Sequence, residues 1–178
     1  AEAAGLFRRA ADQGDADAKY TLGYHLVSVS QDYAKAAALF RRAADQGHLD
    51  AQCELGLAYR DGKGVPQDDR EAARLFRRAA NKGHAGAQCE LGRFFESGRG
   101  MPVDHDEAAR LYRTIARLLA YRAAEQGNPL RPGSRSGACF RLGQYKSAKC
   151  YHQGKGVRQD NREAARLFGL AADQGHVS

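Results

Sequence analysis

The sequence lacks tryptophan, has one methionine and contains no run of 18 apolar residues. A membrane-spanning helix needs about 20 apolar residues, so no span is predicted, and no charged and then apolar leader suggests a signal peptide. The four cysteines include no Cys-x-x-Cys pair, which argues against zinc. The motifs His-Glu-x-x-His, Gly-x-Ser-x-Gly and Ser-x-x-Lys are also missing. We therefore expect no enzyme activity, no cofactor and no metal.

What the 178 residues do contain is alanine, charge and repetition. The net charge is +7, and arginine pairs recur within one phrase, Leu-Phe-Arg-Arg-Ala-Ala, at Arg8, Arg41 and Arg77. A pair that recurs at one place in a repeat indicates the solvated face of a helix. Nucleic-acid binding would need basic residues gathered in a groove with aromatic side chains, so it is not expected. An acidic partner remains compatible with this charge.

A fixed period organises the chain. The segment Gly47 to Gly83 restarts at Gly83, and each residue pair that matches is 36 residues apart: Cys53 and Cys89, Leu55 and Leu91, Gly62 and Gly98, Asp68 and Asp104. A period between 20 and 50 residues is typical of a solenoid, in which each repeat packs on its neighbours. We expect one repeat domain over residues 1–178, divided into a half repeat (1–14), a shortened repeat (15–47), a full repeat (48–83), a repeat with a lengthened second helix (84–127), and a loop with an elaborated final repeat (128–178).

Each full repeat is predicted to be a helix, a turn and a second helix. In the unit 48–83 the first helix should span about Ala51 to Arg60, and Gly62 and Gly64 should end it. Asp68 followed by Glu71 has the spacing of a capping box, and the spacing recurs at Asp104/Glu107 and Asp160/Glu163. The second helix should therefore begin at the same point in three repeats.

The fourth segment departs from this rule. Its second helix reaches the expected glycine eight residues late, at Gly127, and the added turns carry Ile115, Leu118 and Leu119 on one face. The proline- and glycine-containing stretch 128–137 reads as a loop. We expect this region to pack as one local elaboration. If its apolar face is exposed, it would be a site of self-association.

The pattern resembles the Sel-one-like repeat family, relatives of the tetratricopeptide repeats. The residues that carry the resemblance are Ala51, Leu55, Gly56, Tyr59, Gly62, Gly64, Val65, Asp68, Ala72, Leu75, Phe76, Ala79, Ala80 and Gly83. The resemblance implies an all-α fold, a right-handed α/α solenoid of about four and a half repeats. It also implies a non-enzymatic scaffold or adaptor that binds a protein or peptide. Some cysteine-rich relatives are described as penicillin-binding or β-lactamase-like, and such activity is the alternative.

Solenoids of this kind bind partners in the groove formed by their first helices. A helical wheel places Ala51, Leu55 and Tyr59 against the second helix, so the opposite positions should line the groove. The predicted partner-binding residues are Tyr20, Tyr24, Leu57, Arg60, Arg93, Glu96 and Gln144. Aromatic and arginine side chains are common anchors at interfaces, and they would suit a peptide with an apolar and an acidic group.

The cysteines and histidines have simpler interpretations. Cys53 and Cys89 stand at equivalent places in successive helices, about 9–10 Å apart, which is beyond disulfide reach. They should be thiols that fill the seam between helices, whereas Cys139 and Cys150 stay undecided. The lack of pairing by spacing slightly favours a reducing cytoplasm. Three histidines follow helix-ending glycines one repeat apart, so they should be turn residues rather than metal ligands: His48, His84 and His176.

Overall fold

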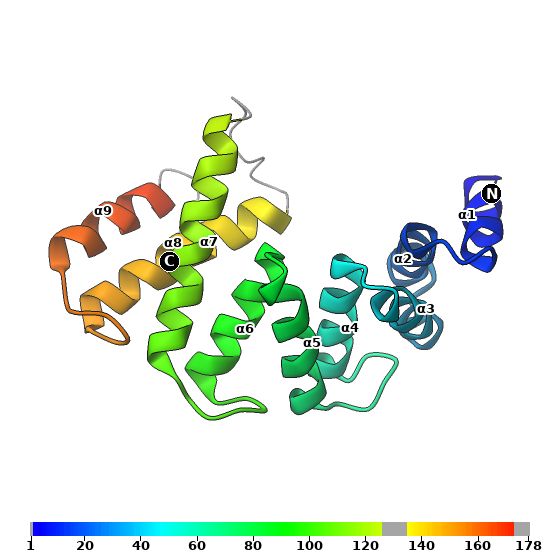
Figure 1. The fold of residues 1–178 in the computed structure, drawn as a ribbon, viewed down its shortest axis with the longest axis horizontal. Coiled ribbons are helices and arrows are strands. Elements are labelled where there is room, and N and C mark those ends of the chain that lie inside the picture. Colours follow the sequence, from blue (N-terminus) through cyan, green and yellow to red (C-terminus); the bar gives the residue numbers. More distant parts are fainter. Residues whose placement is uncertain (1, 126–134, 173–178) are drawn as a thin grey trace. The chain divides into compact units, whose positions relative to one another are not determined.

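A computed structural model describes residues 2–125 and 135–172, and every regular element in these ranges is a helix (Figure 1). The predicted all-α fold of repeated helix pairs is confirmed. Contacts group the chain into two compact units, residues 1–84 and 85–178, whereas the sequence suggested one continuous domain.

The first unit contains five α-helices, each of which packs against the next along the chain. They are α1 (Glu2–Asp12), α2 (Ala16–His25), α3 (Tyr33–Asp45), α4 (Leu49–Asp61) and α5 (Asp69–Asn81). The core is built from alanines with a few large side chains, among them Phe40, Leu55 and Leu75. Between α2 and α3 the chain forms a π-helical turn, Leu26–Ser30, where the shortened repeat has lost its Gly-x-Gly-Val turn.

Glycines bring the two helices of a pair close together. A Cβ atom built on Gly56 of α4 would lie 2.6 Å from Cε1 of Phe76 in α5, whose side chain is fully buried. Gly23 stands in the same relation to Phe40, at 2.7 Å. The Leu-Gly pairs of α2 and α4 therefore each provide a leucine for the core and a gap for the aromatic ring of the next helix.

The second helices begin where the aspartates predict. Asp68 accepts hydrogen bonds from the backbone N–H groups of Arg70 (2.9 Å) and Glu71 (3.1 Å), and Asp104 and Asp160 cap their helices in the same way. The glutamate does not complete the capping box. Glu71 instead pairs with Arg74, because the N–H of Asp68 already donates to the carbonyl of Tyr59 at 3.0 Å.

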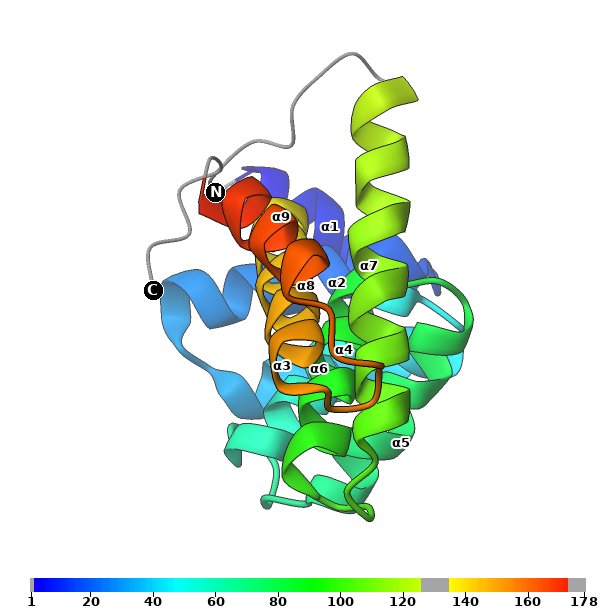
Figure 2. The ribbon, with the colours of Figure 1, turned by 90° about the vertical axis from the view of Figure 1, so that its left-hand side faces the viewer.

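The described residues of the second unit form four helices: α6 (Ala85–Ser97), α7 (His105–Glu125), α8 (Arg135–Gln153) and α9 (Asn161–Ala172). Helix α7 has 21 residues, and its C-terminal part extends beyond α6 and α8 (Figures 1 and 2). Gly143 of α8 packs against Ile115 of α7, where a built Cβ would lie 3.1 Å from the isoleucine Cγ2. Most of the predicted loop lies outside the described residues, but residues 135–137 are already helical.

One glycine of the α4–α5 turn and one of the α8–α9 turn fix the register of these repeats. A side chain at Gly64 would collide with the carbonyl of Tyr33 at the start of α3, and one at Gly156 would collide with the carbonyl of His105 at the start of α7. Both glycines have positive φ, 74° and 67°. The segment from α8 to α9 therefore corresponds to the segment from α4 to α5, with residue numbers 92 higher.

Candidate functional site

Two tyrosines of α2 form an aromatic surface in the first unit. The ring of Tyr20 stacks on His48 with 4.7 Å between centroids, and it also contacts Phe40 (5.9 Å) and Tyr24 (6.3 Å). The side chain of Tyr24 is 45% exposed. The sequence placed both tyrosines on the binding face, and the structure shows that they lie together.

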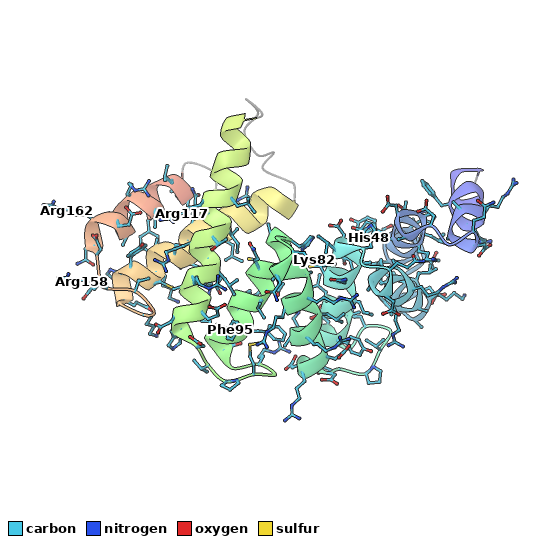
Figure 3. All side chains as sticks on the ribbon, in the orientation of Figure 1. His48, Lys82, Phe95, Arg117, Arg158 and Arg162 are labelled. Atoms are coloured by element: carbon cyan, nitrogen blue, oxygen red, sulfur yellow. The ribbon has the colours of Figure 1, made fainter. Side chains whose placement is uncertain are left out.

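His48 links this aromatic surface to two helices (Figure 3). Its Nδ1 accepts the backbone N–H of Ala51 at 3.1 Å and so caps α4, while its Nε2 lies 3.1 Å from Oδ1 of Asp17 on α2. Because Nδ1 accepts, Nε2 carries the proton and donates to the carboxylate. His84 repeats the link to Asp50 at 3.0 Å. The sequence predicted both histidines to be turn residues after helix-ending glycines and missed this pairing, and His176 lies outside the described residues.

Leu57 and Arg60 lie on α4 in the same unit. Leu57 is half-buried. Arg60 binds the adjacent Asp61 through two hydrogen bonds, Nε to Oδ1 at 2.6 Å and Nη2 to Oδ2 at 3.0 Å. Its charge is therefore largely compensated. Arg93, in the second unit, has a side chain 52% exposed and lies 3.4 Å from the carboxylate of Glu90.

Glu96 does not have the open position expected of a groove residue. Its carboxylate accepts hydrogen bonds from the Tyr112 hydroxyl of α7 (3.1 Å) and the Lys146 ammonium of α8 (2.7 Å). Partial burial favours the protonated acid, but Lys146 and Tyr112 outweigh that effect and hold the pKa of Glu96 below its ordinary 4.5. Burial, and then the charge of Glu96, raises the pKa of Tyr112, so this phenol remains a donor. Glu96 thus ties three helices together.

Gln144 is also misplaced by the sequence-based wheel. It is only 4% exposed, next to Gly143, which packs against Ile115 of α7. Helix α8 is longer than α4, so the two helices are aligned from the glycine turn that follows each of them. This alignment matches Gln144 to Gln52. Gln52 is buried as well, and its Nε2 donates to the carbonyl of Ala44 at 3.1 Å.

The apolar face proposed for self-association is partly covered. Ile115 is fully buried and Leu118 is half-buried, while the side chain of Leu119 is outside the described residues. Among the cysteines, Cys53 and Cys89 are buried thiols and Cys150 is a half-buried one, and none of the three forms a disulfide with a described residue. Burial, followed by the charge of Glu96, raises the pKa of the Cys150 thiol. Cys139 is outside the described side chains.

Neither a membrane span nor a metal cluster is found in the described ranges. No helix there is both long and apolar enough to cross a membrane. Within the same residues, no group of three or more histidine, cysteine, aspartate or glutamate side chains could hold a metal ion.

Comparison with known proteins gives one family and several similar structures. The Sel1 repeat model matches residues 1–15, 16–48, 49–84, 85–118, 114–128 and 136–176. No curated protein matches the chain. A protective antigen of uropathogenic Escherichia coli is 34% identical over 97% of this chain, with a TM-score of 0.79. A Sel1 repeat protein from Oxalobacter formigenes is 26% identical over 98% of the chain, with a TM-score of 0.75. The chain spans 33% of the first protein and 65% of the second.

Proposed function

We propose that this chain, which belongs to the Sel1 repeat family, binds a peptide segment of a partner protein on the aromatic face of α2 and α4. Proteins of the family are generally protein-interaction scaffolds and typically non-catalytic. The observation that carries the proposal is the exposed ring of Tyr24 beside the packed ring of Tyr20. The proposal includes no chemical step.

The physical support is preorganisation. Tyr20 is held between Phe40, His48 and Tyr24, so binding would not need to restrict its ring further. Tyr24 offers an apolar face together with a hydroxyl group, a combination common at interface anchors. An aliphatic or aromatic side chain of the partner would cover the Tyr24 ring.

A peptide library displayed on phage tests this proposal. Peptides are selected on the wild-type chain and their affinities are measured by isothermal titration calorimetry. We expect Tyr24→Ser to weaken binding by at least about tenfold, which corresponds to the loss of about 1.4 kcal/mol or more at an anchor. Leu57→Ser should weaken it less, because Leu57 is already half-buried.

Phe7 supplies the matched control, since it is an aromatic side chain 42% exposed on α1. Phe7→Ser should leave the affinity within about twofold of wild type, and thermal melts should show that Tyr24→Ser stays folded. Selected peptides that bind Tyr24→Ser and Leu57→Ser as tightly as wild type would rule out this face.

A further inference from the structure

A cavity of about 180 Å³ lies between α7, α8 and α9 in the second unit. Its lining combines charged and polar side chains with apolar ones. The residues that matter for its chemistry are Arg113, Arg117, Gln144, Ser147, Arg166 and Leu170. Sequence reasoning gave no sign of this cavity.

Three buried polar atoms at this cavity have no hydrogen-bond partner within the described part of the chain. They are Nε of Arg113, Oε1 of Gln144 and Oγ of Ser147, and Ser147 is only 1% exposed. The amide oxygen of Gln52 also lacks a partner among the described residues, so Gln144 alone would mean little. Among the described residues, an unpaired buried serine hydroxyl and an unpaired buried arginine Nε are found at this cavity alone. A buried polar group left unpaired costs free energy, so a ligand that pairs it gains affinity.

At the matching position of the first unit a large side chain fills the space that is a cavity in the second unit. The register of the turns aligns Ser147 with Leu55, which is 3% exposed and fills the seam between α4 and α5. Arg117 aligns with Asp45, 72 residues earlier, so a cation replaces an anion. Arg41, the counterpart of Arg113, donates to the hydroxyl of Tyr59 at 2.6 Å. The cavity lining therefore differs from the matching place in the first unit by a smaller side chain at Ser147 and by a reversed charge at Arg117.

The cavity and its surroundings carry excess positive charge. Arg166 is neutralised by Glu163, at 2.7 Å, but none of the described carboxylates pairs with the guanidinium of Arg113 or Arg117. A wider hollow of about 780 Å³ shares Arg113 and adds Arg158 and Arg162 at the turn and the start of α9 (Figure 3). The carboxylate of Asp160 in this hollow is used to cap α9.

We propose that this cavity, with the adjoining hollow, binds an acidic peptide. One glutamate or aspartate side chain enters the cavity, where its carboxylate accepts from Arg113 Nε and the Ser147 hydroxyl, with Arg117 at the rim. The volume is below that of sites for drug-sized molecules, so it suits one side chain, and the rest of the peptide lies over the hollow. Water could pair with Ser147 and Gln144, but it would not compensate two arginine charges.

Fluorescence anisotropy with fluorescein-labelled hexaglutamate tests the site, with hexaglutamine carrying the same dye as the uncharged control. We expect the wild-type chain to bind hexaglutamate and not hexaglutamine. Arg117→Asp and Ser147→Leu should each weaken binding by about tenfold or more, because they remove a charged donor and the cavity itself. Arg42→Asp on the exposed surface of α3 changes the net charge equally and should cost less than about threefold.

Other results would overturn the proposal. These are no binding of hexaglutamate at about 1 mM protein, equal losses in Arg117→Asp and Arg42→Asp, or unchanged binding in both cavity variants. Displacement by free glutamate or inorganic phosphate as effective as by unlabelled hexaglutamate would indicate a small-anion site instead of a peptide site. The site is independent of the α2 and α4 face, so Tyr24→Ser should leave hexaglutamate binding unchanged.

Discussion

At the scale of single residues, the glycines facing aromatic rings carry much of the packing. The Phe76 ring is fully buried, so it cannot move aside for a Cβ only 2.6 Å away at Gly56. We expect Gly56→Ala to lower the free energy of unfolding by about 1–3 kcal/mol, because overpacking outweighs the better helix propensity of alanine. Urea unfolding followed by circular dichroism measures this change.

Gly169 of α9 is the matched control for this substitution. It is also a helical glycine, but a Cβ there meets none of the described atoms within 4 Å. Gly169→Ala should raise the free energy of unfolding by up to about 1 kcal/mol through helix propensity alone. Equal effects of the two substitutions would contradict the packing explanation.

Residue roles were predictable where they depend on local spacing. Asp68, Asp104 and Asp160 cap helices because a cap needs only the next three residues. The pairing of His48 with Asp17 was not predictable, since it joins different repeats. The burial of Gln144 was missed for a third reason. The helical wheel assigned it a groove position, whereas alignment from the turn after α8 matches it to the buried Gln52.

At the scale of helices, Glu96 fastens α6 to α7 and α8. Its partners are the hydroxyl of Tyr112 and the ammonium of Lys146, which is 21% exposed. The unfolded carboxylate titrates near 4.5 and the folded one below it. The stabilisation from ionised Glu96 is therefore fully present above pH 4.5 and is lost as the pH falls through the lower folded pKa.

The variant Glu96→Gln tests this linkage. It should cost about 1 kcal/mol at pH 7, because a partly screened charged hydrogen bond is lost. It should also reduce the drop in unfolding free energy between pH 7 and pH 3 relative to wild type. Asp12→Asn, at an exposed carboxylate of α1, should leave that drop unchanged. A Glu96→Gln chain with the wild-type pH dependence would show that this carboxylate does not link the helices.

Helices themselves were well predicted, and their irregularities less so. The delay of the closing glycine indicated a longer second helix, which α7 shows, but the surface that covers Ile115 was not evident. Helix α8 covers Ile115 through Gly143, which is distant from it in the sequence. The π-helical turn Leu26–Ser30 also escaped prediction, because its sequence, Leu-Val-Ser-Val-Ser, has neither glycine nor proline to mark a turn.

At the scale of the whole chain, the fold was predictable because a repeat protein is held by contacts between neighbours. Thirty-six residues of pattern specify one helix pair and its packing, and the chain reuses them. The cavity at Ser147 was not predictable for the complementary reason. It depends on Ser147, which departs from the repeat pattern and lies in a helix whose register is not evident from the sequence. The structure shows that Ser147 takes the place of Leu55.

The grouping of contacts into residues 1–84 and 85–178 predicts how the chain can be divided. In a repeat array, stability is a sum of local terms, so a fragment ending between units should keep its structure. We expect residues 1–84 alone to be helical by circular dichroism and to unfold cooperatively, with a denaturant slope reduced roughly in proportion to length. A fragment of residues 1–66 lacks α5, and with it Leu75 and Phe76, which cover α4. It should lose most of its helicity. Equal helicity per residue in the two fragments, or an unfolded 1–84 fragment, would show that this boundary does not separate folding units.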